Sequence, residues 1–334
     1  MVVRMAQYGV QHGHAAGKAL AIRANPAAEL CGVYEPDPAA RERAQGSRAF
    51  AGVRWYTSAE EMLGDPSIVA VAIEGRNVHS LAMAREAIAA GKHLWYDKPA
   101  GDDWPAFQEL VAVARRKSLV IQMGYMFRYH DGFLKLAEWA RTGLLGDIFG
   151  IRAHMSTSIP EAARAVVAAH LGGILYDLGS HMLDQILWLM GGERPARVTS
   201  FLRNDATPGV PTFADNTLGV VEFRRAMALV DIAAMEPRPT ARRFEVYGTR
   251  GSAILDPMEP PTRIRLCLEA PAGGFSAGEQ TIPLSGASRQ RLYELELEAF
   301  LPALRGEREP DRSLDHELLE QETLLRATGR IPGG

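Results

Sequence analysis

The chain has 334 residues, of which 47% are hydrophobic and 23% are charged, and its formal net charge is −3. This length favours two domains over one, and the apolar content is sufficient for a sizeable core. The nearly balanced charge argues against a nucleic-acid partner, and no apolar run approaches the roughly 20 residues that a membrane span needs.

Residues 1–122 alternate between strand-like and helix-like segments. Strands are predicted at 2–8, 30–34, 53–56, 68–73, 93–96 and 119–123, and helices at 14–24, 38–50, 58–63, 78–90 and 104–117. The run at 68–73 is apolar throughout, which is typical of a strand covered on both faces. Repeated strand–helix alternation predicts a parallel sheet with right-handed crossovers, the doubly wound α/β fold.

From residue 123 onward the pattern changes. Helices are predicted at 132–141, 174–189, 288–304 and 314–327, with some helical character at 161–169. The strand-like runs are 148–156, 197–203, 216–223, 226–233, 244–247, 253–255 and 264–268. This pattern predicts an α+β domain with a large, mainly antiparallel open sheet. We therefore expect two domains, residues 1–122 and residues 123–334.

The cellular location is inferred from the N-terminus and the cysteines. The first residues lack a charged region followed by a long apolar stretch, so no signal peptide is predicted. The chain has two cysteines, Cys31 and Cys267, each in an apolar strand-like run, and both are expected to be buried free thiols. Free thiols fit a reducing compartment, and we expect a cytoplasmic protein.

A glycine-containing turn at residues 9–17 joins the first strand to the first helix. Doubly wound folds usually bind their ligands beyond the carboxyl ends of the strands, and the backbone N–H groups that begin this helix could hold a pyrophosphate. The glycines are spaced by four and do not form G-x-G-x-x-G. The residues expected to border a cofactor here are Gly9, Gln11, His12, Gly13 and His14.

Glu35 directly follows the second predicted strand. An acidic residue roughly 20 residues past the glycine turn can accept hydrogen bonds from an adenosine ribose. It would also repel a 2′-phosphate, which favours NAD over NADP. The alternative is an acidic residue in an ordinary loop.

His12 and His14 form an H-x-H pair that could begin a metal site. Zinc needs three or four ligands, and the neighbouring sequence offers no obvious third one. We therefore predict no metal site, and we expect loop histidines that border the cofactor.

Asp97-Lys98-Pro99 directly follows the fifth predicted strand. Pro99 restricts Lys98 to an extended conformation, which places Lys98 at the carboxyl edge of the sheet. Its amine could hydrogen-bond an alcohol oxygen and stabilise a developing alkoxide. Only five of the 37 basic residues are lysines, so a lysine here is informative. The alternative is a structural lysine paired with Asp97.

Asp177 and His181 form the second candidate for chemistry. If this segment is helical, the two residues stand four positions apart on one face, and Asp184 follows on nearly the same face. A carboxylate beside an imidazole raises its basicity and fixes its tautomer, which suits His181 to accept a hydroxyl proton. The alternative is an ordinary Asp–His pair on a helix surface.

Together these segments resemble the Gfo/Idh/MocA family, named for glucose–fructose oxidoreductase and inositol dehydrogenase. The tripeptide 97–99 resembles the family's Glu-Lys-Pro motif, whose lysine lies between nicotinamide and substrate, and residues 90–93 before it are also similar. Residues 172–184 resemble the segment with a catalytic Asp and His. Residues 124–129 resemble a Gly-Phe-x-x-Arg-Phe-like string that lines the substrate site. The substrate-site candidates are Met126, Phe127 and Arg128, with His154 as a further one.

The resemblance covers essentially the whole chain. It implies an N-terminal NAD-binding Rossmann domain, a C-terminal substrate domain and a homodimer or homotetramer. The implied reaction is NAD-dependent oxidation of a sugar, polyol or related hydroxy compound, with Lys98, Asp177 and His181 as the catalytic residues.

Two departures from the family pattern fall in the expected cofactor cradle. The turn with His12 and His14 replaces G-x-G-x-x-G, and Glu74-Gly75 replaces the usual Thr-Pro after the fourth strand, so Glu74 joins Lys98 among the expected cofactor contacts. Two alternatives stay open. One is an NAD-using glycosidase that oxidises its sugar transiently, and the other is a non-catalytic ligand-binding or sensing protein of the same fold.

Overall fold

The computed structural model describes residues 2–333. The chain divides into two compact units: unit 1 comprises Met1–Met126 and Arg289–Leu318, and unit 2 comprises Phe127–Ser288 and Leu319–Gly334. No helix among the described residues is long and apolar enough to cross a membrane.

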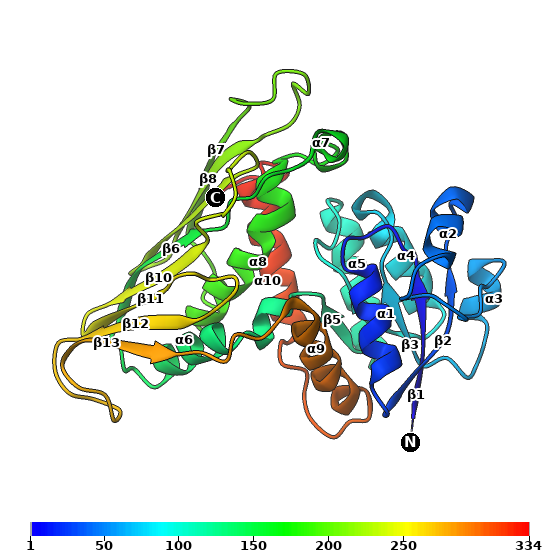
Figure 1. Ribbon diagram of the computed structural model, residues 1–334, viewed down its shortest axis with the longest axis horizontal. Coiled ribbons are helices and arrows are strands. Elements are labelled where there is room, and N and C mark those ends of the chain that lie inside the picture. Colours follow the sequence, from blue (N-terminus) through cyan, green and yellow to red (C-terminus); the bar gives the residue numbers. More distant parts are fainter. Residues whose placement is uncertain (1, 334) are drawn as a thin grey trace. The chain divides into compact units, whose positions relative to one another are not determined.

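The C-terminal segment that returns to unit 1 was expected in the second domain. It contains α9 (Arg289–Leu304), which packs against α1 (Ala15–Ala24). Gly17 allows this approach, because a Cβ at Gly17 would overlap the ring of Tyr293. Figure 1 shows the two helices side by side, although they belong to opposite ends of the sequence. The pattern of a single helix does not show which domain it packs against.

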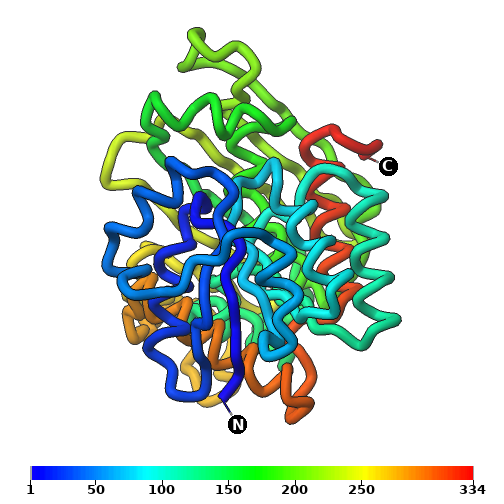
Figure 2. Tube along the Cα trace, turned by 90° about the vertical axis from the view of Figure 1, so that its right-hand side faces the viewer, coloured from blue at the N-terminus to red at the C-terminus, as the bar shows by residue number. Residues whose placement is uncertain are grey.

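Unit 1 is built on a parallel sheet, as predicted, and the sheet has five strands in the order β2-β1-β3-β4-β5. The strands are β1 Val3–Tyr8, β2 Ala28–Tyr34, β3 Ala70–Ile73, β4 His93–Tyr96 and β5 Ile121–Met123. Its other helices are α2 Pro38–Gln45, α3 Ala59–Leu63, α4 Asn77–Ala89 and α5 Trp104–Arg116. Figure 2 shows this unit in the blue and cyan part of the trace, where β1 enters from the N-terminus.

The sheet of unit 1 has a defined ligand edge. All four residues of β3 are buried, as expected of a strand with helices on both faces. β1 lies between β2 and β3. The sheet therefore grows from β1 to one side with β2 and to the other side with β3, β4 and β5. Such a switch point, at the carboxyl ends of the strands, is where doubly wound sheets bind their ligands.

Two predicted elements of unit 1 are shorter than expected. Residues 53–56 contribute a single bridge, between Val33 and Trp55, instead of a strand of the sheet. Helix α2 ends at Gln45 instead of residue 50, and the turn that follows it is closed by a hydrogen bond from the N–H of Ser47 to the Ala44 carbonyl at 2.9 Å.

Unit 2 contains the predicted large, mainly antiparallel sheet, with eight strands in the order β13-β12-β11-β10-β6-β9-β8-β7. The strands are β6 Ile148–His154, β7 Arg197–Arg203, β8 Asn216–Glu222, β9 Met227–Ala233, β10 Arg243–Gly248, β11 Gly251–Leu255, β12 Arg263–Leu268 and β13 Gly278–Pro283. Only the β6–β9 pair is parallel among these neighbours. The sequence did not predict β13, because this edge strand is mostly polar and none of its residues is buried.

Helices cover one face of this sheet, as Figure 1 shows for α6 and α8. The helical segments are the 3-10 turn η1 Met126–Tyr129, α6 Asp131–Arg141, α7 Glu161–Val167, α8 Ile174–Leu189 and α10 Leu314–Ala327, the last shared with unit 1. Side chains alternate along the strands, and in β12 the leucines are buried while Cys267 is exposed. The expectation of a buried thiol is therefore wrong for Cys267, which lies on the open face.

Helix α8 starts at a close contact between two backbones. Gly173, which precedes the helix, has a φ of 49°, and a Cβ there would lie 2.5 Å from the Ala214 carbonyl oxygen. The N–H of Ile174 donates to this same oxygen at 3.0 Å. The contact fixes where α8 begins, and glycine is the residue that permits it.

We predict that Gly173→Ala destabilises the protein by about 1–3 kcal/mol more than Gly191→Ala, because a methyl group must be forced against the Ala214 backbone. Gly191 is the matched control, since its φ of 67° is also left-handed but nothing lies within 4 Å of a Cβ built there. The control should lose about 1 kcal/mol through backbone strain alone. Urea unfolding measures both free energies, and equal losses would contradict the prediction.

Candidate functional site

Five side chains meet at the carboxyl edge of the sheet in unit 1, and we call them the charge cluster: His12, His14, Lys18, Glu74 and Asp97. Lys18 Nζ lies 3.0 Å from Glu74 Oε1 and 3.1 Å from Asp97 Oδ2. His12 Nδ1 lies 3.2 Å and His14 Nδ1 3.1 Å from Asp97 Oδ2. Lys18 and Glu74 are fully buried, and Asp97 is 3% exposed.

The cluster joins three segments that are distant in sequence. Glu74 follows β3 and Asp97 follows β4, so their carboxylates come from adjacent parallel strands. Lys18 comes from α1, and the histidines come from the turn before it. The N–H of His12 also donates to the Glu74 carbonyl at 3.0 Å, which ties the turn to the end of β3.

The carboxylates and histidines of the cluster titrate far from their usual ranges. Burial alone would raise the pKa of Asp97, but His12, His14 and Lys18 hold it well below its usual range. Burial raises the pKa of Glu74 in spite of Lys18. Burial also opposes protonation of His12, but Asp97 and Glu74 raise its pKa to about 9.

His14 differs from His12, because burial lowers the pKa of His14 to about 4 in spite of Asp97. At neutral pH His12 is therefore an imidazolium and His14 is neutral. His12 Nδ1 also lies 3.3 Å from the N–H of His14, but a protonated nitrogen cannot accept this bond. The nearer and charged Asp97 favours the protonated form.

Lys98 lies directly after Asp97 and is 3% exposed. Its backbone N–H donates to Asp97 Oδ1 at 2.8 Å. The lysine is thus held at the carboxyl edge of the sheet by the same carboxylate that binds Lys18.

Glu35 lies at the end of β2 and is bound by the glycine turn. Its carboxylate accepts hydrogen bonds from Val10 N at 2.8 Å, Gln11 Nε2 at 2.9 Å and Asp37 N at 2.9 Å. A carboxylate has about four acceptor positions. One ribose hydroxyl can therefore bind Glu35 directly, and a second one requires the amide of Gln11 to move.

The turn itself leaves room for an anion. Gly9 has a φ of 89°, and a Cβ there would overlap the backbone of Gly75, so the fold requires this glycine. Gly13 is exposed, with nothing within 4 Å of a Cβ built there. No side chain caps α1, although the N–H of Ala15 donates to the His12 carbonyl at 3.1 Å, and a helix N-terminus of this kind attracts a phosphate. Residues of the turn and of α2 line a pocket of about 400 Å³ beside it.

Asp97 supplies the third potential metal ligand that the neighbourhood of His12 and His14 lacks in the sequence. One ligand atom from each of these residues lies within 4.8 Å of the others. However, the Lys18 ammonium binds the Asp97 oxygen that also faces His12. A side-chain cation already neutralises this carboxylate, so the geometry is that of an ion-pair cluster.

In unit 2, α8 carries Asp177 in its first turn and His181 one turn later, as predicted. His181 is 2% exposed, and its ring meets the ring of Phe127 edge-on, with centroids 5.1 Å apart. The structure thus brings two of the predicted site residues into contact. Orientation of His181 by Asp177 stays a prediction.

Arg128, an expected substrate contact, is bound to α8. Its Nε and Nη2 donate to Asp184 at 3.1 and 2.7 Å, and both residues are at most 3% exposed. Gln185 Nε2 donates to the same carboxylate at 2.8 Å. Removing one partner of such a buried pair leaves the other charge uncompensated. The geometry therefore gives Arg128 a role in positioning α8.

His154 lies on the opposite face of the sheet from α8. It alternates with the buried Ala153 and stands opposite Asp231, whereas α8 packs against the face that carries Ile232. His154 Nδ1 lies 3.0 Å from Asp231, and Nε2 lies 3.4 Å from Glu236. The structure does not bring His154 together with His181.

Met126, the last substrate-site candidate, is buried at the end of a segment of unit 1.

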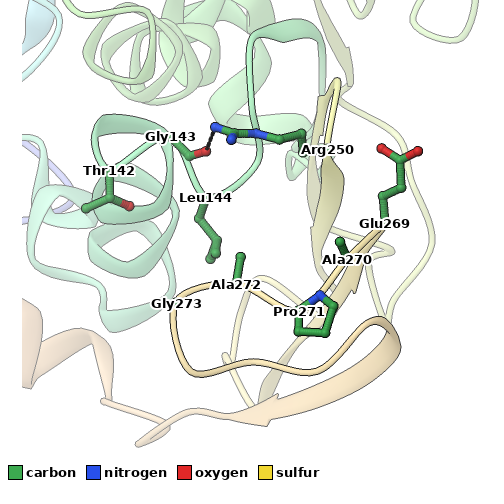
Figure 3. A pocket seen from close by; sticks show the side chains of 9 residues that line it. All are labelled: Thr142, Gly143, Leu144, Arg250, Glu269, Ala270, Pro271, Ala272 and Gly273. Atoms are coloured by element: carbon green, nitrogen blue, oxygen red, sulfur yellow. Dashed lines mark hydrogen bonds between the residues drawn. The ribbon is translucent and has the colours of Figure 1, made fainter.

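A pocket of about 360 Å³ in unit 2 lies between the loop after α6 and the β12–β13 hairpin. Figure 3 shows Arg250 reaching across it to the carbonyl of Gly143. None of the residues that line it belongs to the predicted site.

Sequence reasoning missed Lys18 as a member of the site. The available signal was a lysine one helical turn after His14, within a helix of small and apolar residues, in a chain with five lysines. A buried face of such a helix tolerates a lysine only if a carboxylate receives it.

We predict that His12 and His14 control the pH dependence of folding stability on opposite sides of neutral pH. The pKa of His12, raised to about 9, gives stability that is complete below about pH 6.5 and is lost as pH rises towards 9. The pKa of His14, lowered to about 4, makes stability fall as pH drops from about 6.5 to 4. Scanning calorimetry should show a flatter alkaline limb for His12→Asn and a flatter acid limb for His14→Asn. Unchanged slopes would contradict these assignments.

Comparison with known proteins identifies both parts of the chain. Residues 5–125 match the model of an oxidoreductase family with an NAD-binding Rossmann fold, and residues 133–254 match the GFO/IDH/MocA C-terminal domain. The chain is 29% identical to trans-1,2-dihydrobenzene-1,2-diol dehydrogenase of Sus scrofa over 210 residues, 63% of this chain and 61% of that protein. It is 26% identical to 1,5-anhydro-D-fructose reductase of Ensifer adhaerens over 261 residues, 76% and 74% of the two chains.

The fold is also found among solved structures. GenD2 from gentamicin A biosynthesis, in complex with NAD, superposes with a TM-score of 0.80 at 22% identity, covering 98% of this chain and 94% of that one. The matches to both family models show that the chain belongs to the Gfo/Idh/MocA family of oxidoreductases, with an NAD-binding Rossmann domain at its N-terminus.

Proposed function

We propose that this protein is an NAD-dependent dehydrogenase that acts on a CH–OH group of a sugar, polyol or related hydroxy compound. The observation that carries the proposal is the position of Lys98, buried directly after β4 at the ligand edge of a doubly wound sheet. The relatives named above, a diol dehydrogenase and an anhydro-sugar reductase, support this class of substrate.

The proposed roles follow from the chemistry of the side chains. His181 accepts the hydroxyl proton, and Lys98 stabilises the oxygen as it becomes alkoxide-like. Asp177 orients His181 or binds a neighbouring hydroxyl. NAD, when bound, accepts the hydride from the carbon. The ring of Phe127 packs edge-on against the ring of His181 and limits its movement.

The cofactor is proposed to be NAD rather than NADP. Gly9, Gly13 and the uncapped start of α1 suit a pyrophosphate, and Glu35 suits the adenosine ribose. The Glu35 carboxylate would repel a 2′-phosphate. Its buried hydrogen bonds to the turn hold this charge in place.

We also propose a homodimer or homotetramer in the cytoplasm. The open face of the sheet carries cross-strand apolar pairs, Phe201 with Leu218 and Val220 with Leu229, and Phe201 is 60% exposed. Apolar patches of this kind commonly mark interfaces. Both cysteines are free, which a reducing compartment preserves. Light scattering would count the subunits.

We predict that NAD and NADH stabilise the protein and that NADP does so less. At a hundred times Kd, a ligand of the folded state adds about 2.7 kcal/mol, which thermal unfolding would detect. Glu35→Gln removes the charge but keeps the shape, so it should narrow the difference between NAD and NADP. If no nicotinamide dinucleotide raised the melting temperature, the non-catalytic alternative would be favoured.

We predict that His181→Gln lowers kcat by about 10²–10⁴-fold, the usual contribution of a general base. The assay follows NADH formation with a panel of polyols and sugars that includes myo-inositol and D-glucose. His130→Gln is the matched control, because His130 is also buried in unit 2 and caps α6. Turnover near the wild-type level in His181→Gln would remove this residue from the mechanism.

The same assays distinguish the proposed dehydrogenase from the alternative of an NAD-using glycosidase. An enzyme that oxidises its sugar only transiently would release a leaving group from an aryl glycoside without net NADH. No observation in the structure favours this alternative over the dehydrogenase.

A further inference from the structure

Lys18 is completely enclosed by the site residues of unit 1. Its side chain is 0% exposed, and the ammonium lies 4.5 Å from the centroid of the Trp95 ring. A Cβ at Gly124 would lie 2.7 Å from Lys18 Nζ and 2.9 Å from Asp97 Oδ1. The chain thus provides a fitted chamber for one cation, with Trp95 and Gly124 as walls and two carboxylates as ligands.

Lys18 is the cation that faces both carboxylates of this chamber, Glu74 and Asp97. His12 also faces them, and the buried carboxylate of Glu296 acts on Lys18 from a greater distance. Isolated charges are expensive to bury, and a buried group neutralises by gaining or losing a proton when its partner is removed. Without the ammonium, two carboxylates from adjacent strands would share one imidazolium. These carboxylates would then repel each other unless Glu74, whose pKa burial already raises, took up a proton.

The chamber is connected to Lys98 through a single residue. Asp97 binds Lys18 through Oδ2 and accepts the Lys98 backbone N–H through Oδ1 at 2.8 Å. An Asp97 carboxylate displaced by repulsion from Glu74 would weaken this bond, because a hydrogen bond to a charged acceptor depends on a short distance. The position of Lys98 therefore depends on a lysine that lies 80 positions earlier in the chain.

We propose that Lys18 is a positioning residue, whose buried ammonium binds the carboxylates of Glu74 and Asp97 together and thereby holds the backbone of Lys98 in place for the reaction. This inference rests on the proposed function only for the consequence in catalysis. The link between Lys18 and the Lys98 backbone stands without it.

The test compares Lys18→Met with Lys18→Met/Glu74→Gln, which restores the charge balance. Hydrogen exchange of the purified protein, read by NMR at the Lys98 amide, reports the bond to Asp97. We expect exchange at least about tenfold faster in the single variant and close to wild type in the double variant. Lys92→Met is the matched control, because Lys92 is buried in unit 1 but binds the carbonyls of Asp65 and Ile68. It should leave the Lys98 amide unchanged.

The catalytic readout uses the compound from the polyol and sugar panel that wild type turns over fastest. The single variant should lose about 10- to 100-fold in kcat with little change in KM, whereas Lys92→Met should keep the wild-type values. If wild type turns over none of the compounds, the proposed function is in question, while the exchange measurement still tests the link to Lys98.

Three outcomes would overturn the proposal: an unchanged Lys98 amide in Lys18→Met, an equal effect of Lys92→Met, or a Lys98 amide that exchanges as fast in the double variant as in the single one. If Lys18→Met does not fold, recovery of folded protein by the added Glu74→Gln is the expected result. Failure of that double variant to fold would also overturn the role of charge balance.

Discussion

The ammonium of Lys18, enclosed between the carboxylates of Glu74 and Asp97, is the interaction on which the ligand edge of unit 1 depends. Burying charges is costly, and the cost is offset only when every charge has a partner. This requirement brings together the ends of β3 and β4, the first helix and the turn before it. The same requirement explains why glycine stands at position 124, where Lys18 and Asp97 leave no room for a side chain.

The charge cluster also explains how the glycine turn differs from the common dinucleotide pattern. In G-x-G-x-x-G, the glycines let the backbone approach a pyrophosphate. Here Gly9 instead lets the turn pack closely against the backbone of Gly75, while His14 binds Asp97 and Gln11 binds Glu35. Side-chain hydrogen bonds thus join the turn to the ends of β2 and β4, and a backbone hydrogen bond from His12 to Glu74 joins it to the end of β3. No side chain caps the helix that follows.

Unit 2 uses a second buried ion pair for a similar purpose. Arg128 donates hydrogen bonds from two nitrogens to Asp184 and so positions α8, the helix that carries His181. Phe127, next to Arg128, packs against the His181 ring. The segment that resembles a substrate-lining string thus acts first as a support for α8. In both units, a catalytic candidate is held by a buried pair of opposite charges.

The sequence by itself determined the two folds, because strand and helix periodicities are local properties and are repeated over many residues. It also placed Lys98 at the sheet edge and put Asp177 and His181 on one helix, since each depends only on its nearest neighbours. It did not show that α9 returns to α1, that His154 faces away from α8 or that Lys18 joins Asp97. Those facts depend on which face of an element packs against which partner. Only the tertiary structure decides this, because buried charges must find partners that lie far away in the sequence.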